Sequence, residues 1–260
     1  MVFMPDTAAA QFTVLGPDGP PIDDEQLAGF YAYPADLRAC WVRGNMIASI
    51  DGGATASGKT AALGGAGDRS AFMQMRCAAD VIVVGATTVR TENYSGAQVP
   101  VAQRRARQAR GHAEVPPIAV VTRSGNLDPT ARFFTRTEVP PLILTCTTSA
   151  EETRRRFGAL AEVIDVSASR PAEVDWPTAL RALAERNLLR VLTEGGPLIL
   201  SQLIEHDLLD ELCLTVAPFL VSGQGPRIST GLGEVLTRMR PAHVLTDDDG
   251  YLYTRYVRLG

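Results

Sequence analysis

The sequence has few of the residues that bind metals or form disulfides. Its four cysteines are far apart and form no C-x-x-C pair, and its three histidines show no H-E-x-x-H spacing. This argues against a zinc cluster and against a disulfide scaffold. We therefore expect no metal and a reducing, cytoplasmic environment.

The chain also lacks an excess of positive charge and any long apolar run. Its net charge is −4, which gives no reason to expect a nucleic acid or an anionic membrane as partner. No apolar run approaches the length of a membrane span, and the start of the chain lacks the pattern of a signal peptide. With 260 residues, 45% of them hydrophobic, the chain is typical of a soluble α/β protein.

Lysine is almost absent, and the single lysine lies in a suggestive motif. Residues 52–60 read GGATASGKT, and from Gly53 to Thr60 they fit the pattern G-x-x-x-x-G-K-[ST]. That pattern binds phosphate only where a strand precedes it and a helix begins at the Lys-Thr pair. The glycines at 64, 65 and 67 disfavour such a helix. A P-loop nucleoside triphosphatase is thus an unlikely alternative, and Lys59 either reaches a substrate anion or is merely solvated.

Short apolar runs alternate with amphipathic segments from Trp41 onward. Continuous β-branched runs between helices predict a mainly parallel sheet with helices on both faces. The expected strands are 41–50, 80–85, 117–122, 141–145, 162–166 and 190–194, and the expected helices include 68–79, 149–158 and 175–187.

The two ends of the chain differ from this pattern. Residues 210–220 and the pair 243–247 and 251–259 predict an antiparallel C-terminal edge with a hairpin turn. Residues 95–115 are polar and predict one Arg-rich helix. We interpret residues 1–38 as an N-terminal extension and 39–260 as a single domain.

Polar residues and glycines follow several of the expected strands. Ligands of such sheets bind beyond the carboxyl ends of the strands. After strand 80–85, Gly85 allows close backbone approach, and Thr87, Thr88 and Glu92 follow at the start of a helix that could bind an anion. An ordinary strand-to-helix turn is the alternative.

The next strand end suits a phosphate monoester. Thr122, Arg123 and Ser124 combine a cationic fork with two hydroxyls, and the 2′-phosphate of NADP is one candidate. A solvated turn would have the same composition.

Two further strand ends carry carboxylates. Glu194 precedes Gly195, Gly196, Pro197 and Leu198, where a helix start could meet a pyrophosphate. Glu194 could bind a substrate hydroxyl or amine, or could cap the helix. Asp51 could orient a substrate or hold its own turn. No G-x-G-x-x-G fingerprint is present.

Three segments together resemble a known family. They are NMIASIDGG, RCAADVIVVGATTVRTEN and LTEGGPLILSQLIEHDLLDELCLTVAPFLVSGQGP. Their order resembles the riboflavin-biosynthesis pyrimidine reductase family, the reductase domain of the bifunctional deaminase-reductase, over roughly residues 40–260. The resemblance implies a dihydrofolate reductase-like fold and NADPH-dependent reduction of a ribosylaminopyrimidine to its ribityl form.

The resemblance also implies roles for particular residues. Ala48, Thr88, Glu92, Gly196 and the start of the following helix would contact NADPH, and Arg76 and Glu194 would face a small-molecule substrate. The family commonly forms homodimers. The zinc-deaminase signature, H-x-E with P-C-x-x-C, is absent, so we expect no zinc deamination.

Two positions depart from the family pattern. Asn45 stands where the family usually has Lys in its substrate site, and the segment TVRTENYSGAQV lacks a substrate-binding Arg. A phosphorylated ribose would lose a contact of about 1.5–3 kcal/mol. A reductase acting on a pterin and a non-catalytic NADPH-binding protein therefore stay open as alternatives.

Hydride transfer to a C=N bond depends chiefly on positioning. A proton must also reach the nitrogen, from water or from Asp51, Glu92 or Glu194. The sequence does not decide among these donors.

Overall fold

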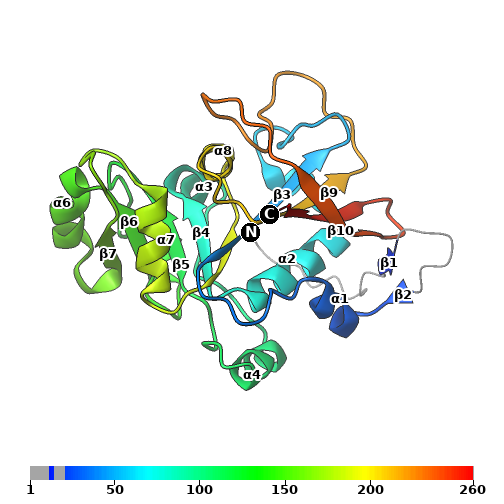
Figure 1. Cartoon of the computed structure of the whole chain (residues 1–260), viewed down its shortest axis with the longest axis horizontal. Coiled ribbons are helices and arrows are strands. Elements are labelled where there is room, and N and C mark those ends of the chain that lie inside the picture. The colour runs from blue at the N-terminus through cyan, green and yellow to red at the C-terminus, as the bar shows by residue number, and fades with distance from the viewer. Residues whose placement is uncertain (1–11, 15–20, 260) are drawn as a thin grey trace.

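The protein is built on one mixed sheet, seen in a computed structural model that describes residues 12–14 and 21–259 (Figure 1). In the described residues the strand order is β2-β1-β10-β11-β9-β3-β8-β4-β5-β6-β7. The strands are β1 (Phe12–Val14), β2 (Pro21–Ile22), β3 (Trp41–Ser49), β4 (Val81–Gly85), β5 (Ile118–Val121), β6 (Leu142–Thr145), β7 (Glu162–Asp165), β8 (Arg190–Thr193), β9 (Glu211–Ala217), β10 (Met239–Thr246) and β11 (Leu252–Arg258).

The predicted parallel core and antiparallel edge are both present. Strands β9, β3, β8, β4, β5, β6 and β7 pair in parallel, whereas β11, β10, β1 and β2 continue the sheet antiparallel. The prediction that residues 210–220 form an antiparallel strand was wrong for one of the two neighbours of that strand. Strand β9 pairs in parallel with β3 from Arg43↔Glu211 to Ser49↔Ala217, and only its other side meets β11 antiparallel.

Helices cover both faces of the sheet, as predicted. Two separate apolar clusters form, one including Ala71 and Met75 of α2, the other including Trp176 of α7 and Leu200 of α8. No helix in the described ranges is long and apolar enough to cross a bilayer. The helices are α1 (Asp24–Phe30), α2 (Ala66–Ala78), α3 (Ala86–Thr91), α4 (Val101–Ala109), α5 (Arg132–Thr135), α6 (Thr147–Phe157), α7 (Trp176–Ala184) and α8 (Pro197–Glu205), with the 3-10 turns η1 (Thr60–Ala62) and η2 (Gly158–Leu160).

A buried ionic cluster joins the N-terminal segment to the sheet. Glu211 of β9 accepts from both Arg43 of β3 and Arg255 of β11, and Arg43 and Glu211 are fully buried. Arg43 Nη1 also donates to the carbonyl of Tyr31 (2.7 Å), and Arg255 Nη1 donates to that of Phe30 (2.8 Å). These guanidinium groups thus fix the end of α1 to the centre of the sheet.

The first turn of α2 packs tightly against the C-terminal hairpin. Gly65 is its N-cap, and Gly67 faces the hydroxyl of Tyr253, which donates to Asp247 (2.6 Å). A Cβ on Gly67 would overlap that hydroxyl and lie 2.6 Å from Asp247 Oδ2. The glycines that disfavour a helix start at Thr60 are therefore compatible with one at Ala66, because the hairpin leaves no room for a larger residue.

We expect Gly67→Ala to lower the free energy of unfolding by about 1–3 kcal/mol, since overpacking forces the tyrosine or the helix to shift. Urea denaturation measures it. The matched control is Gly29→Ala in α1, where a Cβ would meet nothing within 4 Å. The control is expected to stabilise by about 0.5–1 kcal/mol. An equal response of the two variants would contradict the packing argument.

Candidate active site

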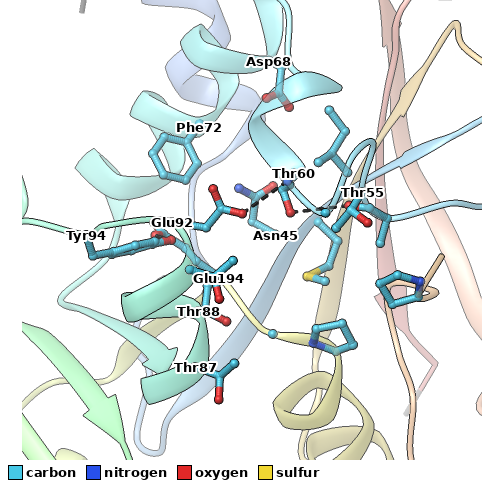
Figure 2. Close-up of a pocket in the computed structure, with 18 residues that line it drawn as sticks. Asn45, Thr55, Thr60, Asp68, Phe72, Thr87, Thr88, Glu92, Tyr94 and Glu194 are labelled. Carbon is cyan, nitrogen blue, oxygen red and sulfur yellow. Dashed lines mark hydrogen bonds between the residues drawn. The ribbon is translucent and has the colours of Figure 1, made fainter. Parts of the chain in front are cut away.

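A cavity of about 350 Å³ lies beside β3 and beyond the carboxyl ends of β4 and β8 (Figure 2). Its walls come from β3, the 54–60 loop, α2, α3 and the turn between β8 and α8. The lining residues are Asn45, Met46, Ile47, Ala54, Thr55, Gly58, Thr60, Asp68, Phe72, Thr87, Thr88, Thr91, Glu92, Tyr94, Glu194, Gly196, Pro197 and Pro226.

Glu194 is held rigidly at the end of β8. Arg76 of α2 donates through Nε to Oε1 and through Nη2 to Oε2, both at 2.7 Å, and the Tyr94 hydroxyl donates to Oε2 at 2.8 Å. Burial lowers the pKa of Arg76, but Glu194 and Tyr94 together more than offset this and raise it, so the guanidinium stays charged. Burial, followed by Glu194, raises the pKa of Tyr94 well above its usual value.

Tyr94 reaches Glu194 because of how α3 ends. Asn93 has a positive φ of 50°, and the Tyr94 amide donates to the carbonyl of Val89 (3.0 Å) while that of Asn93 donates to Arg90 (3.4 Å). This is a Schellman motif, which reverses the chain after the last helical turn. The reversal places the phenol beside a carboxylate on another strand.

Glycines pack the β4–α3 and β8–α8 turns against each other. The Gly85 amide donates to the Gly195 carbonyl (2.9 Å), and Gly195 has a positive φ of 85°. A Cβ on Gly196 would lie 2.9 Å from Thr88 Oγ1. Glycine at position 196 avoids this overlap, and Gly196 and Thr88 both line the cavity.

The P-loop reading of residues 53–60 is wrong. Ser57 and Gly58 both have positive φ, and Ala56 and Lys59 exchange backbone hydrogen bonds, which defines a tight hairpin turn of type I′. The Thr60 amide donates to Glu92 (3.2 Å). The amides of Ala56, Lys59 and Thr60 are thus already used, and α2 begins only at Ala66.

Asp51 and Ala48, both predicted site residues, do not line the cavity. Asp51 accepts from Ser49 Oγ (2.5 Å) and from the amides of Val221 and Ser222. The hydroxyl of Ser49, and then the amides of Ser222 and Val221, lower the pKa of Asp51 to about 2. Asp51 thus fixes a loop distant in sequence, while Ala48 is buried in β3.

Residues 122–124 lie at the same sheet edge but outside the cavity. Thr122 is buried, whereas Arg123 and Ser124 are exposed beyond β5. Arg90 connects this edge to the cavity, because its Nη1 donates to the Asn126 carbonyl (3.0 Å) and its Nη2 donates to Thr87 Oγ1 (3.2 Å). A long ligand could therefore extend from the cavity along Thr87 to Arg123.

The cavity lining is acidic. It contains the carboxyls of Asp68, Glu92 and Glu194 but, among the residues that the structure describes, no Arg, Lys or His. Asn45 lines the wall at the position of the expected family lysine. Lys59 is exposed in the neighbouring turn. Within the described ranges, no group of His, Cys, Asp and Glu is arranged to hold a metal.

The sequence profile of the RibD C-terminal domain matches residues 40–253. The chain belongs to this family. It is 25% identical over 212 residues to riboflavin biosynthesis protein RibD of Chlamydia pneumoniae, which covers 81% of this chain and 54% of that protein. The chain thus spans about half the length of that relative.

Two further proteins are similar to this chain in sequence or structure. A 2,5-diamino-6-ribosylamino-4(3H)-pyrimidinone 5′-phosphate reductase of Aquifex aeolicus is 30% identical over 162 residues, 62% of this chain and 66% of that protein. The crystal structure of a pyrimidine reductase-like protein from Corynebacterium diphtheriae superposes with a TM-score of 0.78 at 27% identity, covering 92% of this chain and all of that one. The fold is dihydrofolate reductase-like, as the resemblance implied.

Asp68, Phe72 and Tyr94 are among the residues that line the cavity of this RibD C-terminal domain and that sequence reasoning missed. Asp68 and Phe72 lie one helical turn apart on α2, and Tyr94 follows α3. Asp68 looked like an ordinary acidic residue of a first helical turn. The usable signal was the i, i+4, i+8 spacing of Asp68, Phe72 and Arg76, which places all three on one face of the helix.

Proposed function

We propose that this protein is an NADPH-dependent reductase that converts a ribosylaminopyrimidine to its ribityl form. The observation that carries the proposal is Glu194, fixed by Arg76 and Tyr94 beside the Gly195–Gly196 turn in a RibD C-terminal domain. Family membership supports a reductase. The fixed carboxylate of Glu194 lies next to the Gly195–Gly196 turn, and this supports a site where substrate and cofactor bind side by side.

The residues of the carboxyl edge fit a dinucleotide. The absence of side chains at Gly85 and Gly196 leaves a backbone cradle that a Cβ would narrow, and the start of α8 at Pro197 and Leu198 can face a pyrophosphate. We assign Thr87 and Thr88 to the same ligand, and Thr122, Arg123 and Ser124 to its 2′-phosphate. When bound, NADPH supplies a hydride.

Glu194 is suited to bind a hydroxyl of the substrate. A carboxylate has about four acceptor positions, and Arg76 and Tyr94 occupy three of them. The remaining position, on Oε1, can accept from a ribose hydroxyl and so hold the reacting carbon against the cofactor site. Arg76 and Tyr94 keep the acceptor in place during this step.

Glu92 is the carboxyl we assign to proton delivery. Asp51 is occupied by the 221–222 loop, and Glu194 accepts from three donors, a pattern that suits a carboxylate rather than an acid. In the part of the chain that the structure describes, the Glu92 carboxyl accepts a hydrogen bond from the Thr60 amide, and Glu92 lies near the middle of the lining residues in Figure 2. It can therefore pass a proton to the substrate nitrogen, directly or through water.

The test measures NADPH consumption by absorbance in the presence of each of three substrates. They are 2,5-diamino-6-ribosylamino-4(3H)-pyrimidinone 5′-phosphate, 5-amino-6-(5-phosphoribosylamino)uracil and dihydrofolate. We expect turnover of at least one ribosylaminopyrimidine. Turnover of dihydrofolate alone would replace the pyrimidine with a pterin. NADPH binding without any turnover would leave a non-catalytic nucleotide-binding protein, and failure to bind NADPH would remove the proposal.

A further inference from the structure

A buried arginine of α4 binds the end of the helix that carries Arg76. Arg107 is fully buried in the polar segment that separates α3 from β5. Its Nη1 donates to the main-chain carbonyls of Cys77 (2.8 Å) and Ala79 (2.7 Å), and at 3.4 Å to that of Arg76 itself. Its Nε donates to the carbonyl of Ala113 (2.8 Å). One guanidinium group thus joins the last turn of α2 to the segment that follows α4.

These contacts offset the cost of burying a cation. The last carbonyls of a helix have no partner inside it, and a cation placed there interacts favourably with the helix dipole. In the part of the chain that the structure describes, no carboxylate pairs with Arg107, its Nη2 has no hydrogen-bond partner, and burial lowers its pKa. A buried charge without such a partner is costly. The carbonyls at the end of α2 are therefore the groups that hold this cation in place.

Arg76 belongs to two networks at once. Its carbonyl accepts from Arg107, while its Nε and Nη2 donate to the two carboxylate oxygens of Glu194, both at 2.7 Å. A bidentate pair of this kind needs both donors in the plane of the carboxylate. A shift of the last turn of α2 would move these donors, and a misplacement of about 1 Å at a binding group can cost about 10²-fold in rate.

We infer that Arg107 is a positioning residue, which fixes the end of α2 so that Arg76 holds Glu194 in place for the substrate. No residue of α4 is among the lining residues of the cavity, and Figure 1 shows α4 well apart from α3 and α8. The effect therefore passes through α2 and not through contact with substrate or cofactor. The inference rests on the proposed function, because that function gives Glu194 its ligand.

The first measurement follows the contact between Arg76 and Glu194 without any substrate. The Nε–H of Arg76 donates to a buried carboxylate, so its NMR signal in isotope-labelled protein should exchange slowly with water. The signal is assigned by its loss in Arg76→Lys. Exchange should be at least about tenfold faster in Arg107→Met, which removes the donors to α2 and keeps an apolar side chain. The matched control is Arg104→Met on the same helix, which breaks a pair with Glu138 and should leave the exchange unchanged.

The second measurement separates positioning from a general loss of stability. Arg107→Met should lower kcat/KM for the substrate that the wild type turns over by about tenfold, while the affinity for NADPH stays within about twofold. In the Arg76→Lys background the same substitution should have no further effect, because the contact through which it acts is already lost. A purely structural loss would lower kcat/KM equally in both backgrounds.

Arg107→Gln, which is shorter and uncharged, is a second variant that should give the same result if Arg107→Met does not fold. Exchange of the Arg76 proton at the wild-type rate in either folded variant would overturn the inference. Equally fast exchange in Arg104→Met, or additive losses of kcat/KM in the two backgrounds, would also overturn it. Faster exchange in Arg107→Met, in a protein whose wild type turns over none of the three substrates, would remove the proposed function and leave the positioning of Arg76 standing.

Discussion

Glu194→Gln is expected to lower kcat/KM for the ribosylaminopyrimidine substrate by about 10²–10³-fold. Gln cannot balance the charge of Arg76, whose side chain is only 12% exposed, and it replaces one acceptor of the substrate hydroxyl with a donor. Removing one partner from a buried, hydrogen-bonded charge pair costs about 2–5 kcal/mol. Steady-state kinetics with NADPH as the varied and then the fixed substrate measures the effect.

Three comparisons separate this loss from general damage. Tyr94→Phe removes one donor to Glu194 and should cost only about tenfold. Glu185→Gln makes the same chemical change at an exposed position and should be neutral. NADPH affinity of Glu194→Gln should stay close to wild type. A kcat/KM within a few-fold of wild type would show that Glu194 does not contact the substrate.

Glu211→Gln is expected to lower the free energy of unfolding by about 3–5 kcal/mol, the largest stability effect among these changes. The substitution leaves Arg43 and Arg255 at the centre of the sheet without a carboxylate, and Arg43 is fully buried. Chemical denaturation at neutral pH gives the difference. Glu152→Gln, which breaks an exposed pair with Arg155, is the control and should cost less than about 1 kcal/mol.

The same residue predicts a pH dependence. Burial raises the pKa of Glu211, but Arg43 and Arg255 outweigh burial and hold it below its ordinary value of 4.5. A group with a lowered pKa in the folded state contributes stability above its unfolded pKa and loses it as pH falls through the folded one. The difference in the free energy of unfolding between the wild type and Glu211→Gln should therefore shrink as the pH falls below about 4.5. If the difference in the free energy of unfolding between the two proteins stayed constant as the pH fell below 4.5, this prediction would be contradicted.

The sheet could be predicted from the sequence because its signals are local. Continuous apolar runs located the parallel strands within a few residues, and the helix expected over 175–187 is α7, which Asp175 caps by accepting from the Thr178 amide (2.9 Å). The pairing of β9 with β3 could not be predicted in this way. It depends on Glu211 meeting Arg43, which lies 168 positions earlier in the chain.

The site could be predicted in part. Glu194, Gly196, Thr87, Thr88 and Glu92 were expected at strand ends and do line one cavity. Asp51 was expected there too, but its carboxylate turns toward amides 170 and 171 positions later, which no local pattern reveals. Asp68 escaped notice for the opposite reason. Its sequence surroundings are ordinary, and only the approach of β9 and the loop before α2 places it in the cavity wall.

The attachment of α1 to Arg43 and Arg255 extends the folded unit beyond the segment that matches the family. The family match starts at residue 40, yet the donors of Arg43 and Arg255 end on main-chain oxygens of residues 30–32. The segment that matches the family is therefore shorter than the segment that packs together as one folded unit. A fragment trimmed to the matched segment would keep every wall of the cavity and would still lose the acceptors that its central cations require.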